Sequence, residues 1–249
     1  MTYHCKAFGF AAVLALSPMV APAATVDITF QSFGSGNSVD KAGAIAAQNA
    51  FMGSSSIIGA EDFENFTACP DTSCASANDT TAIASTQVGD FYRFGSATGS
   101  GNAQLDPKDD IVVRMNNPNN TFSRFDVVGG AKWLDSNDHV GIRWEIPGAS
   151  SGLSDIRKIA FFLTDVDDVR GFAFSFDVSQ DTLDTVNMIG KPHNNRPDGE
   201  LQLVTMLFDA PVNLISIEMR SGTNDGFGID GIQVGTVPLP ASALLLLGG

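Results

Sequence analysis

Val140-Gly141-Ile142-Arg143-Trp144-Glu145-Ile146 is the stretch that decides the fold class, because apolar residues alternate in it with glycine or charged residues. Successive side chains of a β-strand point to opposite faces, so the alternation predicts a strand with one apolar face. Residues 172–178 repeat the pattern with three phenylalanines and a valine. Residues 158–163 are apolar on both faces, as in a strand that is covered on both sides.

Shorter stretches on both sides of this region complete an all-β pattern. Further strands are predicted over residues 26–30, 61–66, 88–94, 111–115, 201–208, 212–219 and 227–234. Residues 201–208 and 212–219 are predicted to form a hairpin around Asp209-Ala210-Pro211. One short helix near the N-terminus is predicted from Asp40, which can cap it, to Met52, before Gly53. The sequence therefore predicts an antiparallel β-sandwich of jelly-roll type with one short helix.

The N-terminus carries the three parts of a secretory signal peptide. Lys6 supplies a positive charge, residues 7–20 are almost entirely apolar, and Ala21-Pro22-Ala23 supplies the small residues of a cleavage site. We therefore predict a signal peptide over residues 1–23, a mature chain that starts at Ala24, and one domain over residues 24–235. A transmembrane anchor is the alternative, but the apolar run is too short for one.

Residues 236–249 form a separate tail. Val237-Pro238-Leu239-Pro240-Ala241 places two prolines in five residues, which excludes a helix interior or a central strand, and a short apolar run follows. This order resembles the C-terminal sorting signal of PEP-CTERM proteins of Gram-negative bacteria, in its Val-Pro-Leu-Pro-Ala variant. The resemblance implies that an exosortase-type processing enzyme recognises the tail, and that the chain meets the membrane only through it.

The tail departs from the family pattern in its length. In the family, a membrane-spanning helix and a basic cluster follow the motif. Here the apolar run is shorter than the ~20 residues that a spanning helix needs, and no Lys or Arg follows it. Either the chain ends inside the signal, which we favour, or the tail is degenerate. A tail packed on the domain is a third alternative, against which Pro238 and Pro240 argue.

The chain is strongly acidic, with 14 Lys and Arg against 28 Asp and Glu and a net charge of −14. Loss of Lys6 with the signal peptide leaves 13 against 28, a net charge of −15. Such a surface repels nucleic acid and anionic lipid headgroups, so neither is an expected partner. It favours divalent cations, and the alternative is a solvated acidic surface with no cation-dependent role.

Cys69 and Cys74 are the cysteines that stay after Cys5 leaves with the signal peptide. In an exported chain, an even pair predicts a disulfide that here closes a small surface loop. A zinc site would need two further Cys or His ligands nearby, and the sequence has none there.

Two groups of acidic residues are candidate calcium sites. Glu61 and Glu64 on an early strand, with Asp225 and Asp230 near the last strand, resemble carbohydrate-binding jelly rolls in which a Glu and an Asp hold a structural calcium. The resemblance implies Glu64 and Asp230 as ligands, and Glu61 and Asp225 as outer candidates. The alternative interpretation is that Asp230 only shapes a turn.

The alternative calcium site is the turn that contains Asp165, Asp167 and Asp168, between two predicted strands. Hard cations take clustered carboxylate oxygens, so three acids in one turn suit calcium. A solvated acidic turn is the competing interpretation.

Trp133 is the candidate ligand-binding residue, because it lies near a predicted loop and its ring can stack on a sugar; partly buried packing is the alternative. His139 and His193 are the only histidines after the signal peptide, and neither a Gly-x-Ser-x-Gly nor a His-Glu-x-x-His motif is present. We therefore expect a protein without enzymatic activity.

These features lead to two hypotheses for function. The first is an exported protein that passes through the periplasm, is sorted by an exosortase, and has a structural or adhesive role at the cell surface or in the extracellular matrix. The alternative is a calcium-dependent module that binds extracellular polysaccharide. A hydrolase is a third hypothesis, which no catalytic motif supports.

Overall fold

The computed structural model describes residues 25–68, 86–94, 112–115, 124–136, 141–147, 152–166, 169–177, 183–188, 199–221 and 226–237. These residues form two antiparallel β-sheets and one α-helix, together with the short 3-10 helix η1 (Gly36–Ser38). The predicted all-β sandwich with one helix near the N-terminus is confirmed. The signal peptide, Cys69, Cys74 and Pro238 to Ala241 lie outside the described residues, as do Asp167, Asp168 and Asp225.

The larger sheet has seven strands. Across the sheet they follow the order β1 (Val26–Ser35), β10 (Glu200–Val212), β7 (Ile156–Thr164), β12 (Gly228–Thr236), β5 (Lys132–Asp135) and β4 (Val112–Met115), and β2 (Ser56–Glu61) also pairs with β12. One edge of β12 pairs with β7, and its other edge is shared by β5 at its start and β2 further along.

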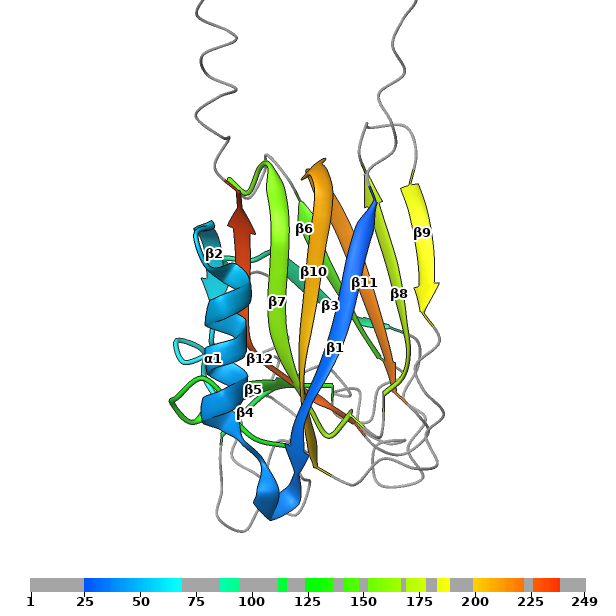
Figure 1. Ribbon diagram of the computed structural model, residues 1–249. Helices are drawn as coiled ribbons and strands as arrows, with labels where there is room; N and C mark the ends of the chain where they lie inside the picture. Colours follow the sequence, from blue (N-terminus) through cyan, green and yellow to red (C-terminus); the bar gives the residue numbers. More distant parts are fainter. Residues whose placement is uncertain are drawn as a thin grey trace, which may run out of the picture.

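The smaller sheet has five strands, and it faces the larger one across the core (Figure 1). Its order is β3 (Asp90–Phe94), β6 (Gly141–Pro147), β11 (Leu214–Ser221), β8 (Val169–Asp177) and β9 (Leu183–Met188). The alternation in β6 has the predicted result, because Ile142, Trp144 and Ile146 are buried between the sheets. Stacked and edge-on ring pairs join Trp144 to Phe91 of β3 and to Phe161 of β7, at centroid distances of 5.4 and 5.7 Å.

Helix α1 (Lys41–Met52) lies on the outer face of the larger sheet, where it contacts β10, β7 and β1 (Figure 1). Its predicted caps are confirmed: the Asp40 carboxylate accepts the backbone N–H of Gly43 at 2.8 Å, and Gly53 ends the helix with φ +48°. A second, smaller apolar cluster under the helix includes Ala44, Met52 and Phe162.

Two expectations about the strands are wrong. Residues 61–66 do not form a strand: β2 ends at Glu61, and a turn follows. Residues 201–219 do not form a hairpin, because β10 belongs to the larger sheet and β11 to the smaller one. The early strand that carries Glu61 does lie beside the last strand, since β2 pairs with β12. The local sequence pattern predicts an extended conformation for each of these segments. Contacts with distant strands decide whether each one pairs, and with which strand.

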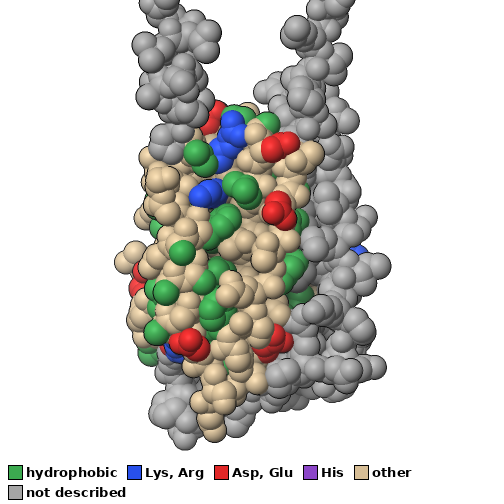
Figure 2. All heavy atoms as spheres, in the orientation of Figure 1, with side chains coloured by type: hydrophobic (Ala, Val, Ile, Leu, Met, Phe, Trp, Pro, Cys, Tyr) green, Lys and Arg blue, Asp and Glu red, His purple; other side chains and the backbone are tan. Residues whose placement is uncertain are grey.

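The surface is mixed in character. On the face shown in Figure 2, hydrophobic side chains are scattered among polar atoms. Within the described ranges, no helix has both the length and the apolar character that crossing a membrane requires.

A polar pocket beside the bulge of the last strand

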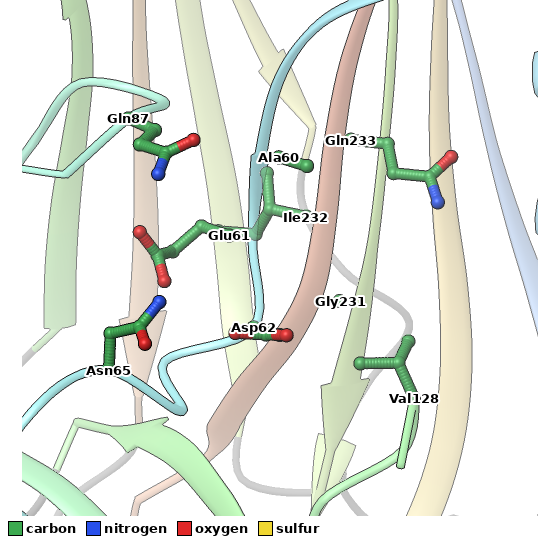
Figure 3. A pocket seen from close by; sticks show the side chains of 9 residues that line it. All are labelled: Ala60, Glu61, Asp62, Asn65, Gln87, Val128, Gly231, Ile232 and Gln233. Atoms are coloured by element: carbon green, nitrogen blue, oxygen red, sulfur yellow. The ribbon is translucent and has the colours of Figure 1, made fainter. Parts of the chain in front are cut away.

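A polar pocket with a volume of about 370 Å³ opens where the end of β2 meets β12. It is lined by Ala60, Glu61, Asp62, Asn65, Gln87, Val128, Gly231, Ile232 and Gln233. In Figure 3 the side chains of Glu61, Asn65 and Gln87 point toward one another, whereas Gln233 points away on the other side of β12. One carboxylate and two amides, from three separate turns and strand ends, therefore converge on the same space.

A β-bulge in β12 forms one wall of the pocket. Asp230 pairs with Phe162 of β7 and Gln233 with Ala160, so β12 has one residue more than its partner over this interval. Gly231 lies in the bulge with φ +56°, a conformation that favours glycine. The buried side chain of Gln48 on α1 donates to the carbonyl of Gly231 at 2.5 Å, which ties the helix to the bulge.

Asp230 is fully buried behind this bulge. Its carboxylate accepts the backbone N–H groups of Val127 at 2.5 Å, Val128 at 3.1 Å and Gly231 at 2.7 Å. Burial raises the pKa of Asp230 to about 7, against the lowering effect of these three donors. Asp230 therefore anchors the segment that carries Val128 into the pocket wall.

Glu64 anchors the same segment a few residues further along. Its Oε1 atom accepts the N–H groups of Ala131 at 2.7 Å and Lys132 at 2.6 Å. The Lys132 ammonium donates in return to the carbonyl oxygens of Glu64 at 2.6 Å and Phe66 at 2.8 Å. Two acids that are 166 residues apart in the sequence thus hold one loop, residues 127–132, against the edge of the larger sheet.

The turn after β2 positions the acidic side of the pocket. Phe63 adopts φ +59° and buries its ring in the core, 6.0 Å from the Phe91 ring. A phenylalanine in this backbone region is strained, and such strain is common where a turn has to place a functional group. The carboxylates of Glu61 and Asp62 accept the N–H groups of Phe63 and Glu64, at 2.8 and 3.1 Å, and so stabilise the turn.

Glu61 is the buried acid of the pocket, with 8% of its surface exposed. Burial raises the pKa of its carboxyl group, the nearby Asp62 raises it further, and the N–H of Phe63 lowers it. Among the described lining residues there is no Lys or Arg. The described lining is therefore acidic, and its buried carboxylate is hydrogen-bonded by backbone N–H groups of Phe63, Gln87 and Asp62.

The predicted calcium ligands serve a different purpose here. The carboxylates of Glu64 and Asp230 accept hydrogen bonds from backbone N–H groups. The backbone therefore binds both carboxylates as anions, and this geometry does not suit the binding of a cation. Within the described ranges, no group of three or more Asp, Glu, His or Cys side chains is placed to hold a metal ion. These two residues do not fit a calcium site in this arrangement. Calcium binding elsewhere in the chain stays a prediction.

Asp165, which belongs to the alternative calcium site, is buried, with 2% of its surface exposed. Its carboxylate accepts the N–H of Gly199 at 3.0 Å and lies 3.6 Å from the Arg124 guanidinium. The interpretation as a solvated acidic turn is therefore wrong for Asp165, because an arginine distant in the sequence neutralises it.

Trp133 is fully buried on β5, so the prediction that its ring stacks on a sugar is wrong. The ring packs against the backbone of Gly228, where an added Cβ atom would come within 2.8 Å of Trp133 Cδ1. Sequence reasoning missed Asn65 and Gln87, because amides in turns have no periodic signal. It did identify Glu61, as an outer candidate for calcium.

Comparisons with known proteins add little to this picture. No protein-family model matches the chain, and no curated protein matches it. Among solved structures it is similar to the xylan-binding domain from CBM 22, at 11% identity over 51% of this chain and 82% of that one, with a TM-score of 0.27. It is also similar to TmCBM61 in complex with beta-1,4-galactotriose, at 13% identity over 51% and 83%, with a TM-score of 0.24. Likeness at this level carries no argument about function.

Proposed function

We propose that this domain is a non-catalytic β-sandwich that binds carbohydrate, and that a sugar unit occupies the pocket at Glu61, Asn65 and Gln87. The observation that carries the proposal is the convergence of one carboxylate and two amides in a pocket of about 370 Å³ (Figure 3). Ligand pockets for small molecules fall in a range of about 300–1,000 Å³.

The chemistry of these three side chains matches that of sugar hydroxyls. A hydroxyl group both donates and accepts, a carboxylate accepts, and an amide does both through two different atoms. Glu61 is held in place by the N–H of Phe63, so its orientation is set before a ligand arrives. Neighbouring hydroxyls of one sugar ring can bond to Glu61 and to an amide at the same time, which favours polyhydroxylated ligands.

The proposal places this binding outside the cell. Support comes from the signal-peptide pattern over residues 1–23 and from the sorting motif at Val237 to Ala241. An exported domain that binds extracellular polysaccharide would have the adhesive role that the sequence suggests. An exosortase-type enzyme would be its processing partner.

A glycan array followed by calorimetry tests the binding site. We expect Asn65→Ala and Gln87→Ala each to weaken binding of the selected glycan by five- to tenfold, the loss of about 1 kcal/mol expected for one hydrogen bond. Asn49→Ala on α1 and Gln31→Ala on β1 are matched controls, because both side chains are exposed outside the pocket. An array without binders, or affinities that neither pocket variant changes, would contradict the proposal. A second array in excess chelator tests calcium dependence.

The N-terminus of secreted protein tests the predicted export. Intact mass and N-terminal sequencing of secreted protein should give a chain that starts at Ala24 or within two residues of it. Secreted material that still begins with Met1 would refute the signal-peptide assignment.

A further inference from the structure

We propose that protonation of Asp230 controls ligand binding in this pocket, because its carboxylate joins two parts of the pocket wall. The inference rests on the proposed function and concerns the regulation of the same site. It is drawn from the hydrogen bonds of the buried carboxylate and from the positions of the residues that donate them.

Two residues of the pocket wall are held by Asp230. Its Oδ2 atom accepts the N–H groups of Val127 and Val128 at 2.5 and 3.1 Å, and its Oδ1 atom accepts the N–H of Gly231 at 2.7 Å. Val128 and Gly231 both line the pocket (Figure 3). They lie so close together that a Cβ atom at Gly231 would clash with Val128 Cγ1. The carboxylate therefore joins the loop side and the strand side of one wall.

These three hydrogen bonds suit the ionised carboxylate. An ionised carboxylate only accepts, whereas a protonated one carries an O–H donor on one of its two oxygens. A proton on Oδ2 would face the N–H groups of Val127 and Val128, and a proton on Oδ1 would face the N–H of Gly231. Protonation of either oxygen thus weakens the connection between the loop and the bulge.

The far end of the loop has a separate anchor. Glu64 Oε1 accepts the N–H groups of Ala131 and Lys132 at 2.7 and 2.6 Å, and Asp230 takes no part in these bonds. Protonation of Asp230 therefore frees only the end of the loop that carries Val128. The loop can move at this end while it stays attached at the other.

The surroundings of Asp230 set the direction of the pH dependence. Burial raises its pKa to about 7, and the charge of Asp126 in the adjoining chain raises it further. Lys41 of α1 pairs with Asp126 at 3.3 Å, and β7 presents the uncharged Phe162. Below this pKa Asp230 is neutral and the wall is loose, whereas above it the wall is held. Ligand affinity should therefore fall as the pH falls.

NMR spectroscopy of the full chain tests the switch without a ligand. Between pH 5 and pH 9, the carboxyl carbon of Asp230 and the backbone amides of Val128 and Gly231 should titrate with one common midpoint. The amides of Ala131 and Lys132 should not follow it, because Glu64 holds them. Wall amides that do not respond when the Asp230 carboxyl titrates would overturn the inference.

Calorimetry then measures the effect on binding, with the array glycan that gives the strongest signal at pH 8 as the probe. If only the ionised form binds, a group with a pKa of about 7 lowers the affinity about tenfold from pH 8 to pH 6. Asp230→Asn keeps the size of the side chain but replaces one acceptor with an NH₂ donor. It should bind weakly at both pH values, with less than a twofold difference. Asp27→Asn, at an exposed position on β1, is the matched control and should keep the wild-type dependence.

The outcomes distinguish this inference from the proposed function. Wild-type affinities within twofold of each other at the two pH values would overturn the switch and leave carbohydrate binding in place. A dependence that persists in Asp230→Asn would do the same, and would indicate Glu61 or Asp62, the acids that line the pocket. An array without binders at either pH would refute the proposed function, and with it the control of binding, even if the wall amides titrate. If Asp230→Asn fails to fold, the amide titration of the wild type decides instead.

Discussion

Asp135 lies in a buried network of charged side chains that no local pattern in the sequence reveals. Its carboxylate pairs with Arg114 of β4 through one oxygen, and with Arg124 Nη1 through the other at 2.5 Å. Arg124 in turn lies 3.6 Å from Asp165 at the end of β7. Two positive and two negative charges thus compensate one another where β4, β5 and β7 end, and the compensation makes their burial tolerable.

Removal of one charge from this network should be costly. We expect Asp135→Asn to lower the free energy of unfolding by about 3–5 kcal/mol, because it removes the charge of a buried carboxylate that two buried guanidinium groups contact. Urea denaturation measures the loss, and the dependence of the unfolding free energy on urea concentration should be unchanged. Asp27→Asn, at an exposed position on β1, is the matched control and should change stability by less than about 0.5 kcal/mol. A small effect at Asp135 would mean that the network is open to water.

Asp230 should make the stability of the protein depend on pH. Its carboxyl pKa is about 7 in the fold against an ordinary value of 3.8. The folded state therefore holds a proton between these values that the unfolded state has lost, and stability falls as pH rises from about 4 to about 7. The contribution amounts to about 4 kcal/mol at most.

Comparison with Asp230→Asn isolates this contribution, because the variant cannot ionise there. Between pH 4 and pH 8, the difference in unfolding free energy between variant and wild type should move by up to about 4 kcal/mol in favour of the variant. Denaturation curves for both proteins at several pH values give this difference. A difference that is constant over the whole range would contradict the buried position of Asp230.

At the scale of the element, the bulge in β12 connects the helix, the pocket and the loop over residues 127–132. Gly231 receives a hydrogen bond from Gln48 of α1, donates one to Asp230, and lines the pocket. A Cβ atom at Gly231 would clash with Val128 Cγ1 and come within 2.8 Å of Phe162 Cδ2. The bulge therefore requires glycine for its packing as well as for its backbone conformation.

A pair of glycine substitutions separates these two requirements. Gly231 and Gly36 have similar conformations, with φ +56° and +52°, but a Cβ atom at Gly36 would meet nothing within 4 Å. We expect Gly36→Ala to cost about 1 kcal/mol for the backbone alone. Gly231→Ala should cost about 2–4 kcal/mol, because overpacking adds to the backbone cost. Thermal or urea unfolding of both variants measures the two losses of stability. Equal losses would mean that the bulge shifts to make room for the added Cβ atom.

At the scale of the whole molecule, thermal melting tests directly whether the folded protein binds calcium. A cation that binds only the folded protein stabilises it by about 2.7 kcal/mol at a hundredfold excess over its dissociation constant. Since Asp230 and Glu64 bind backbone N–H groups, we expect any rise in melting temperature in millimolar calcium to be the same in wild type and in Asp230→Asn. A rise that this variant abolishes would restore Asp230 as a ligand. Asp167→Asn tests the alternative site in the same buffers.

Much of the fold was predictable because its signals are local. Period-two alternation depends on the two faces of a single strand, so β1, β6 and β8 were identified from their own residues. The helix was equally clear, since Asp40 and Gly53 act within one turn of its ends. Net charge is a sum over the sequence and needs no structure.

The site and the sheet order were decided only by tertiary structure. β10 and β11 look like a hairpin locally, yet each has better partners in a different sheet. Trp133 lies near a predicted loop and is buried, whereas Asp165 lies in an acidic turn and is paired with Arg124. Glu61, Asn65 and Gln87 meet only because β2, two turns and the bulge of β12 come together. Burial and convergence depend on contacts between distant segments, and a sequence pattern that spans a few residues contains no information about them.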